Sequence, residues 1–323
     1  MNRVGKLYDQ IISIDNLNLA DAKARKGKSA QYGVQQHDKT REANIMKLHD
    51  MLLTKCYRTS AYTTFIIREP KEREIYRLPY FPDRITHHAV MNILEEIFTD
   101  CFTADTYSCI KGKGIHAAQR AVERALKDKT GTQYCLKLDI RKFYPNVDHE
   151  ILKTLLRRKF KDADLLWLLD EIIDSTAGLP IGNYLSQYFA NFYLTRFDHW
   201  LKEQKKVKYY FRYADDIVIL SDNKPLLHEL LFDIKTYLRN ELKLQVKANY
   251  QVFPVEEKNG RGIDFVGYVF YHTHTLLRKS IKQNCARAAK RKNNQKIMAG
   301  YNGWMKAANC KNLKQKVYGN TVQ

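Results

Sequence analysis

The alternation of apolar and polar residues predicts a chain that mixes helices with strands. Helical spacing of apolar positions covers residues 44–53, 88–98, 115–126, 149–160, 164–173, 185–201 and 226–242. Residues 1 to about 60 are helical and basic as a whole, and Asp164 is the predicted N-cap of its helix. Short β-prone runs cover residues 63–68, 73–79, 134–139, 209–211 and 217–220, and residues 260–277 give further short strands. These elements together predict an α+β fold.

Two adjacent carboxylates interrupt two of the β-prone runs at Tyr213-Ala214-Asp215-Asp216. Asp is depleted in strands and favoured in turns. The pattern therefore predicts a strand, a tight turn that presents acids, and a returning strand. A third acid, Asp139, ends the apolar run at residues 134–139.

Carboxylates in such positions indicate a site for divalent cations. Two hard cations about 4 Å apart can clamp the attacking and leaving oxygens of a phosphoryl transfer. Mg²⁺ suits such a site because it takes oxygen ligands and shares its coordination shell with substrate phosphates. The alternative is an exposed acidic turn together with an unrelated acid at a strand end.

With these residues in place, the sequence resembles a reverse transcriptase over nearly all of its length. Asp139 matches the acid of the family's first palm motif, and Tyr213–Asp216 matches the second. Arg68–Ile75 lies where the fingers of the family carry triphosphate-binding cations, and Asp105–Gly114 follows it. Gly262–Tyr268 resembles the primer grip. The order of the motifs implies a right-hand polymerase with fingers, a palm built on an antiparallel sheet, and a short helical thumb.

The resemblance also divides the chain into predicted regions. They are an N-terminal helical extension at 1–60, fingers at 61–133 with inserted helices at 155–178, a palm at 134–154 and 179–275, and a basic helical thumb at 276–323.

One motif resembles a particular subfamily. Gly178-Leu-Pro-Ile181-Gly182-Asn-Tyr-Leu-Ser186-Gln187 has Ile-Gly where most reverse transcriptases carry Gln-Gly, and it ends in Ser-Gln where most end in Ser-Pro. This departure is similar to the reverse transcriptases of diversity-generating retroelements, and residues 301–313 resemble the end of their thumb. The resemblance implies copying of a template-repeat RNA into cDNA with errors at template adenines. It also implies an accessory variability determinant protein as partner.

The resemblance assigns roles residue by residue. The catalytic and metal-binding residues are Asp139, Asp215 and Asp216, with the Ile140 carbonyl as a further ligand of two Mg²⁺ ions, for which Mn²⁺ is a substitute. The nucleotide-binding residues are Lys71, Arg73, Lys142, Phe143, Tyr144 and Ile181, and the primer and template residues are Gly182, Gln187, Tyr213, Gly267 and Tyr268.

Several of these roles have simpler alternatives. Tyr144 matches the steric gate that rejects a ribose 2′-hydroxyl, but it could equally be an ordinary core aromatic. Lys71 and Arg73 suit phosphate contact, but neighbouring glutamates could simply pair with them. Ile181 offers only shape where Gln offers hydrogen bonds, which predicts reduced fidelity unless Ile181 merely packs. His272 and His274 lack a third zinc ligand, and Gly112-Lys-Gly114 lacks the pattern of an ATP site.

Composition agrees with a nucleic-acid enzyme. The formal charge is +20, and residues 276–323 carry twelve cations with no Asp or Glu. Such clustering is expected for contacts with phosphate backbones, although a solvated basic tail is the alternative. The six cysteines lack paired zinc spacing and are expected to be reduced thiols. No apolar leader or long apolar run is present, so a location in the cytoplasm of a bacterial or phage-infected cell is expected.

Three rival functions differ from this interpretation. A group II intron maturase or a retron enzyme is expected to keep Gln at position 181, and a maturase is expected to continue into a further domain after the thumb. A catalytically inactive, polymerase-like scaffold that binds RNA would tolerate loss of the acids, all three of which are present. Magnesium-dependent incorporation of dNTPs would distinguish the enzyme from the scaffold.

Overall fold

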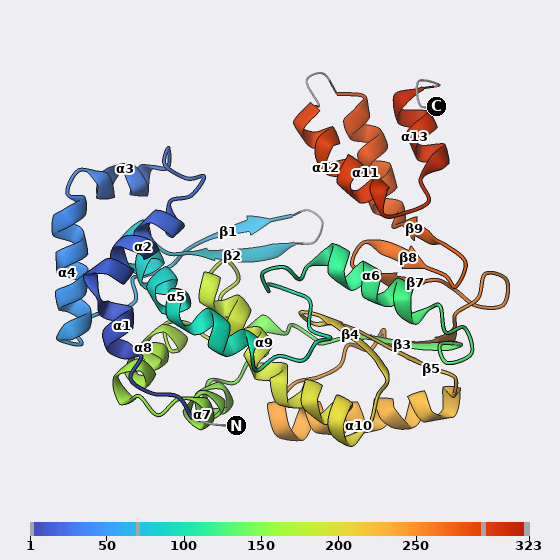
Figure 1. Cartoon of the computed structure of the whole chain (residues 1–323), viewed down its shortest axis with the longest axis horizontal. Coiled ribbons are helices and arrows are strands. Elements are labelled where there is room, and N and C mark those ends of the chain that lie inside the picture. The colour runs from blue at the N-terminus through green and yellow to red at the C-terminus, as the bar shows by residue number, and fades with distance from the viewer. Residues whose placement is uncertain (1–2, 69–71, 292–294, 320–323) are drawn as a thin grey trace. The chain divides into compact units, whose positions relative to one another are not determined.

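The computed structural model describes residues 3–68, 72–291 and 295–319 and confirms the predicted α+β fold (Figure 1). The chain forms two compact units. The first unit comprises Met1–Thr103, Lys142–Asp198 and Arg239–Leu244, and the second comprises Ala104–Arg141, His199–Leu238 and Gln245–Gln323. Strands paired in the named sheets are antiparallel throughout.

The first unit is mainly helical, with one two-stranded hairpin. Its elements are α1 (Tyr8–Ile12), α2 (Ile14–Ala24), α3 (Tyr32–Asp38), α4 (Arg41–Leu53), β1 (Thr63–Ile67), β2 (Arg73–Arg77), the helical turn η1 (Tyr80–Arg84), α5 (Ile85–Thr99), the 3₁₀ turn η2 (Tyr144–Asn146), α7 (His149–Lys159), α8 (Ala163–Ile173) and α9 (Tyr184–His199, whose last residue belongs to the second unit).

Aromatic side chains hold the helices of the first unit together. The fully buried ring of Phe98 on α5 lies 5.2–6.3 Å from the rings of four neighbours, which come from the end of α7 and from α9. Those neighbours are Phe160, Tyr188, Phe189 and Phe192. Aromatic pairs at these separations favour edge-to-face and offset packing, so Phe98 fixes α5 against α9.

The described part of the second unit contains two antiparallel sheets and six helical elements. They are α6 (Ile115–Ala125), β3 (Tyr134–Asp139), the helical turn η3 (Trp200–Gln204), β4 (Tyr209–Tyr213), β5 (Asp216–Ser221), α10 (Lys224–Leu242, whose last four residues belong to the first unit), β6 (Gln251–Pro254), β7 (Ile263–Phe265), β8 (Tyr268–Phe270), β9 (Thr275–Leu277), α11 (Lys279–Ala289), α12 (Gln295–Lys306) and α13 (Lys311–Tyr318).

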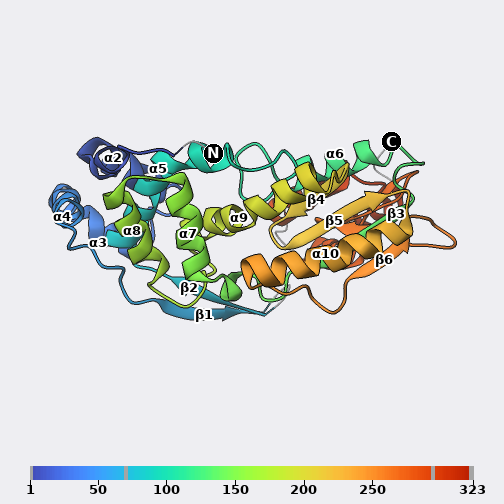
Figure 2. The ribbon, with the colours of Figure 1, turned by 90° about the horizontal axis from the view of Figure 1, so that it is seen from below.

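The larger sheet has the strand order β4-β5-β3-β6 and is covered by a helix on each face (Figure 2). Val218 and Leu220 on β5 join the core that includes Ala118 and Val122 of α6. Because successive strand residues point to opposite faces, Ile217 and the other alternate positions of β5 face away from α6. Figure 1 shows α10 running along that opposite face.

The smaller sheet, β7-β8-β9, supports the C-terminal helices α11, α12 and α13. Cys285, Met298 and Met305 are buried in the core that also contains Phe265 and Tyr268. Within the region predicted as a basic thumb, residues 276–323, the described residues begin with the end of β9 and are then mostly helical, in α11, α12 and α13. Ile297 of α12 is 47% exposed.

Some predicted boundaries are wrong, and others remain predictions. Asp162, not Asp164, is the N-cap of α8, and its carboxylate also accepts the backbone N–H groups of Leu7 and Tyr8. α5 begins three residues before His88. The limits of fingers, palm and thumb stay predictions. Among the described helices, none combines the length and the apolar character needed to span a lipid bilayer.

Candidate active site

Strands β3 and β5 of the second unit bring the predicted acids to one end of the larger sheet. Asp139, the last residue of β3, lies opposite Asp216, the first residue of β5. Asp215 occupies the preceding turn, and its carbonyl accepts the N–H of Ile140 at 3.2 Å. About a quarter of the side chains of Asp139 and Asp216 is exposed, so solvent and ligands reach both.

The acidic turn itself is held by buried polar groups. Ala214 has a φ of 54°, in the left-handed region that non-glycine residues rarely adopt. Its N–H donates to the hydroxyl of Ser108 at 3.0 Å, and its carbonyl accepts from the guanidinium of the fully buried Arg212 at 3.2 Å. Backbone bonds pair Arg212 with Asp105 and Tyr107, so the segment Asp105–Gly114 contributes to the support of the turn.

Two lysines outside the predicted site contact the acids. The ammonium of Lys137 lies 2.9 Å from Asp216 Oδ1 and also donates to the backbone carbonyl of Asp264. The ammonium of Lys247 lies 3.6 Å from Asp139 Oδ1. The period of two along a strand places Lys137 on the same face as Asp139, so strand alternation was the signal that could have revealed it. Lys247 carries no comparable local signal.

The electrostatics of Asp216 indicate a site that attracts positive charge. Burial raises the pKa of Asp216 to about 6, the nearby ammonium of Lys137 opposes that rise, and the negative charges of Asp139 and Asp215 add to it. Like charges held this close repel one another, and a divalent cation would relieve that repulsion.

The donor chemistry fits Mg²⁺, although the protein does not supply a complete shell. Within the described ranges, no three His, Cys, Asp or Glu side chains are placed to hold a metal ion by themselves. Mg²⁺ is usually bound by one or two carboxylates and completed by substrate phosphates and water. Asp139, Asp215 and Asp216 would hold the ions, together with the backbone near the buried Ile140.

The predicted sugar and triphosphate contacts lie in the first unit. Lys142 is exposed and has a φ of 43°, Phe143 is buried, and Tyr144 is half-buried. The rings of Phe143 and Tyr144 meet edge to face at 5.7 Å. Of the two aromatics, therefore, Phe143 belongs to the core and Tyr144 keeps an accessible surface. The Tyr144 carbonyl accepts the N–H of Leu179 at 2.8 Å, which ties it to the chain before Ile181.

Ile181 and Gly182 are fixed against the β1-β2 hairpin of the same unit. The carbonyl of Ile181 accepts the N–H of Tyr76 at 2.8 Å. Gly182 has a φ of 123°, and a Cβ there would lie 2.5 Å from the Tyr76 carbonyl oxygen. Only glycine fits this position, so the backbone that carries the half-buried Ile181 is fixed against β2.

The other predicted residues divide into exposed and buried ones. Arg73 is exposed at the start of β2, Gln187 is exposed on α9, and Tyr213 is half-buried on β4. Lys71 lies outside the described residues. Gly267 and Tyr268 are buried beneath Trp304 of α12, whose ring lies 5.2 Å from that of Tyr268. The Tyr268 side chain therefore faces the core, where it packs the smaller sheet against the C-terminal helices.

Replacing Lys137 by Met tests its contact with Asp216. We expect Mn²⁺ to bind severalfold more tightly to Lys137→Met than to the parent, because the ammonium no longer competes for the carboxylate. Primer extension is expected to fall, because Asp216 loses the contact that orients it. Electron paramagnetic resonance measures the concentration of free Mn²⁺ and so reports the affinity. The measurement is made at a pH above the pKa of Asp216.

The charge-preserving variant Lys137→Arg is the matched control and is expected to keep parental Mn²⁺ affinity. Equal affinity in Lys137→Met and the parent would contradict a competing role for Lys137.

A mixed helix and strand chain with acids at one end of an antiparallel sheet is the fold of a nucleic-acid polymerase. Residues 69–269 match the family described as "Reverse transcriptase (RNA-dependent DNA polymerase)". The chain belongs to this family of RNA-directed DNA polymerases, whose members generally use divalent metal ions such as Mg²⁺.

The relatives include proteins of group II introns. The chain is 24% identical to Protein YkfC of Escherichia coli over 278 residues, which cover 72% of this chain and 71% of that protein. It is 26% identical to the group II intron-encoded protein LtrA of Lactococcus lactis over 139 residues, 40% of this chain and 23% of LtrA. The chain therefore spans under a quarter of LtrA.

The fold is that of a known polymerase. The structure of apo telomerase from Candida tropicalis superposes with a TM-score of 0.51 at 12% identity, covering 73% of this chain and 53% of the telomerase chain. At this identity, the likeness confirms the predicted polymerase fold and no more.

Proposed function

We propose that this chain copies a template-repeat RNA into error-prone cDNA, with errors at template adenines, as part of a diversity-generating retroelement. The observation that carries the catalytic part is the convergence of Asp139, Asp215 and Asp216 at one sheet end. Two bound Mg²⁺ ions would neutralise charge that develops during the transfer. The primer 3′-hydroxyl attacks the α-phosphate of the dNTP and pyrophosphate leaves. The chain's acids hold this centre, and Tyr144 would exclude a ribose.

The subtype rests on residues 178–187. Ile181-Gly182 and Ser186-Gln187 depart from the Gln-Gly and Ser-Pro of most reverse transcriptases. Within the first unit, the backbone of Ile181 is fixed by its hydrogen bond to Tyr76 of β2. Apolar contacts distinguish ligands by only about 1–3 kcal/mol, whereas a site built on hydrogen bonds distinguishes them far better.

Replacing Ile181 by Gln is expected to lower misincorporation opposite template adenine by roughly tenfold, since one hydrogen-bonding site adds on the order of 1–2 kcal/mol of discrimination. Sequencing of cDNA from primed RNA templates measures the error spectrum at each base. Ile181→Leu keeps an apolar side chain of equal size and serves as the control, with a parental spectrum expected. Equal spectra for Ile181→Gln and the parent would remove the hypothesis.

A second candidate is a reverse transcriptase of the group II intron type. The match to LtrA over 139 residues supports it. The parental error spectrum separates the two candidates: a uniformly low error rate favours the intron type, and errors concentrated at adenines favour the retroelement.

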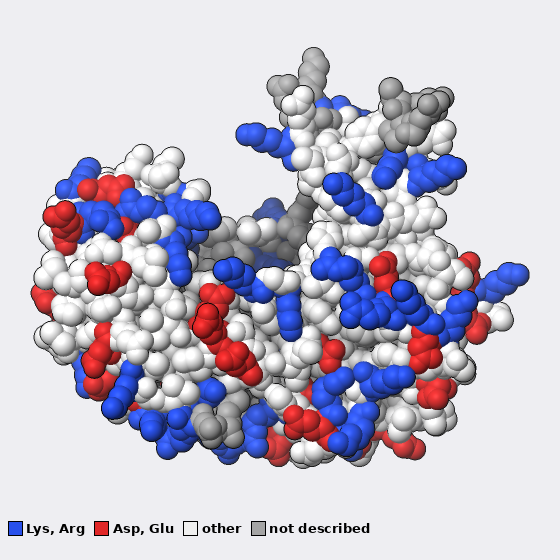
Figure 3. Space-filling model, viewed as in Figure 1, with Lys and Arg blue, Asp and Glu red and all other residues white. Residues whose placement is uncertain are grey.

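The remaining parts of the proposal concern partners and location. Template RNA and its cDNA are the nucleic-acid partners, with an accessory variability determinant protein beside them, and the cytoplasm of a bacterial or phage-infected cell is the expected site of action. The exposed cations support contact with nucleic acid: Figure 3 shows Lys and Arg side chains gathered over α6 of the second unit.

A further inference from the structure

A pocket in the first unit is lined by cations and aromatic rings that the active site does not use. It has a volume of about 560 Å³ and lies where α3, α4 and residues 77–84 meet. The lining residues that matter here are Tyr32, His37, Arg77, Tyr80, Phe81 and Arg84.

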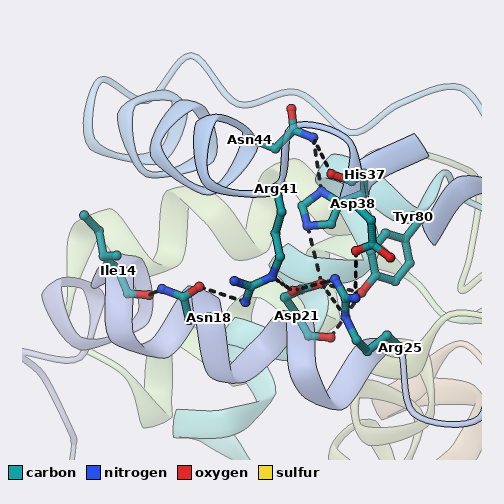
Figure 4. A network of polar contacts seen from close by, with 9 residues as sticks. All are labelled: Ile14, Asn18, Asp21, Arg25, His37, Asp38, Arg41, Asn44 and Tyr80. Atoms are coloured by element: carbon teal, nitrogen blue, oxygen red, sulfur yellow. Dashed lines mark hydrogen bonds and ion pairs between the residues drawn. The ribbon is translucent and has the colours of Figure 1, made fainter. Parts of the chain in front are cut away.

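One side of this pocket is built on a buried carboxylate, Asp21 (Figure 4). The hydroxyl of Tyr80 donates to Asp21 at 2.5 Å, and Nε2 of His37 lies 3.4 Å from the same carboxylate. The amide nitrogen of Asn44 lies 3.2 Å from Nδ1 of His37. His37 in turn stacks on Phe81 with ring centres 5.7 Å apart. The aromatic wall is therefore held in one arrangement.

The cations at this pocket differ in their ion pairing from the other arginines of the first unit. Among the residues that the structure describes, neither Arg77, Arg84 nor the neighbouring Lys28 forms an ion pair with an Asp or Glu. Arg25 and Arg41 of the same unit, by contrast, both bind Asp21. Figure 3 shows Lys and Arg side chains over this part of the first unit, around α2 and α3.

These cations lie close enough to repel one another. Burial lowers the pKa of Arg84, and the positive charge of Arg77 lowers it further. Burial likewise lowers the pKa of Lys28, with the charge of Arg84 acting in the same direction. Cations gathered without a counter-charge repel one another and destabilise the folded protein when no anion is bound. They therefore favour the binding of an anion.

The shape and chemistry of the pocket favour one kind of anion. A guanidinium matches the geometry of a phosphate through two parallel N–H donors. The Tyr32 ring at the pocket is 75% exposed, which leaves its face free to stack on an unpaired base. A base inside a duplex has no free face to offer.

We infer that this pocket binds a phosphate of single-stranded RNA through Arg77 and Arg84, with an adjacent base stacked on Tyr32. The site belongs to the first unit and contains none of the residues assigned to metal, nucleotide, primer or template. The inference rests on the proposed function only for the choice of RNA as the nucleic acid.

The test measures binding of a fluorescein-labelled single-stranded RNA of about ten nucleotides to the full chain, by anisotropy at several salt concentrations. Replacing Arg77 and Arg84 together by Gln is expected to weaken binding at least tenfold. The slope of log affinity against log salt is expected to fall by about 0.7, because one phosphate contact is lost and each such contact on a single strand contributes about 0.7. Lys47→Gln, an exposed cation on α4 outside the pocket, is the matched control and is expected to keep parental affinity.

The Tyr32→Ala variant tests the stacked base independently of the phosphate contact. Loss of one stacked base is expected to weaken binding about tenfold without changing the salt slope, since no charge is removed. In the absence of RNA, the melting temperature of the Arg84→Gln variant is expected to equal or exceed that of the parent, because the substitution removes a charge that repels Arg77 and Lys28. A lower melting temperature would instead assign Arg84 a structural role and overturn the inference.

Unchanged affinity and slope in the double Gln variant would overturn the inference. Binding of a polyglutamate peptide as tight as that of RNA would overturn it in favour of an acidic protein partner. Primer extension, measured separately, distinguishes this failure from that of the proposed function. A parent that binds RNA through these residues but never extends a primer contradicts the proposed function alone.

Discussion

A variant with Asn at both position 215 and position 216 is expected to lose primer extension by at least about a thousandfold. Several kcal/mol of transition-state stabilisation come from metal ions in such centres, and each 1.36 kcal/mol corresponds to a factor of ten in rate. Asn is nearly the same size as Asp but carries no charge, so it preserves the turn while it removes the attraction for cations. Incorporation of dNTPs on a primed RNA template measures the effect.

Asp222→Asn is the control for this experiment. Asp222 is exposed just beyond β5 and makes its side-chain contact with Ser221, so the same chemical change there is expected to leave the rate intact. If the folded double Asn variant extends primers at the parental rate, these acids do not form the catalytic centre.

Replacing Asp21 by Asn is expected to destabilise the first unit by about 3 kcal/mol. Breaking a buried ion pair typically costs about 3–5 kcal/mol, and the low end applies because Arg25 and Arg41 keep some contact with water. Asp21 is fully buried and accepts from Arg25 at 2.8 Å, from Arg41 at 2.7 Å and from Tyr80 at 2.5 Å. Hydrogen exchange of α2 and α3, together with thermal melting, measures the loss.

Asp38→Asn is a matched control, because Asp38 pairs with the same Arg25 at 2.7 Å but is 43% exposed. A loss of under about 1 kcal/mol is expected for this surface pair. Equal destabilisation by the two variants would contradict the importance of burial at Asp21.

The contribution of Asp21 to the stability of the folded protein also depends on pH. Burial alone would raise the pKa of Asp21, but hydrogen bonds from His37, Tyr80 and the two arginines outweigh burial and hold the pKa well below its usual range. The stabilisation is therefore fully present above the pKa of an unfolded Asp, about 3.9, and is lost as the pH falls below that value. The stability gap between parent and Asp21→Asn should accordingly be constant near neutral pH and shrink in acid.

Local pattern was sufficient to predict the acidic centre. Asp139 ends an apolar run and Asp215-Asp216 interrupts two others, so strand periodicity and turn preference together placed them at strand ends. The register that sets Asp139 opposite Asp216 confirms that these strand ends meet. The metal-binding roles themselves stay predictions.

The features that could not be predicted from the sequence depend mostly on residues that are far apart along the chain. Asp21 lies in an ordinary helical segment, and its partners Arg41 and Tyr80 come from 20 and 59 residues further along the chain. Strand β6 was missed because its four residues end in proline, which is tolerated on an edge strand but reads as a strand breaker. Asp164 was predicted as the N-cap, and only the fold shows that Asp162, two residues earlier, accepts the N–H of Leu165.

The backbone at Gly182 limits how copying accuracy can be altered by saturation mutagenesis. Any side chain there would strike the Tyr76 carbonyl, and the φ of 123° is itself unfavourable for other residues. A library that randomises both 181 and 182 would consist almost entirely of damaged clones, whatever their error rates. Selection for more faithful or more mutagenic copying should therefore randomise position 181 alone and keep the following glycine constant.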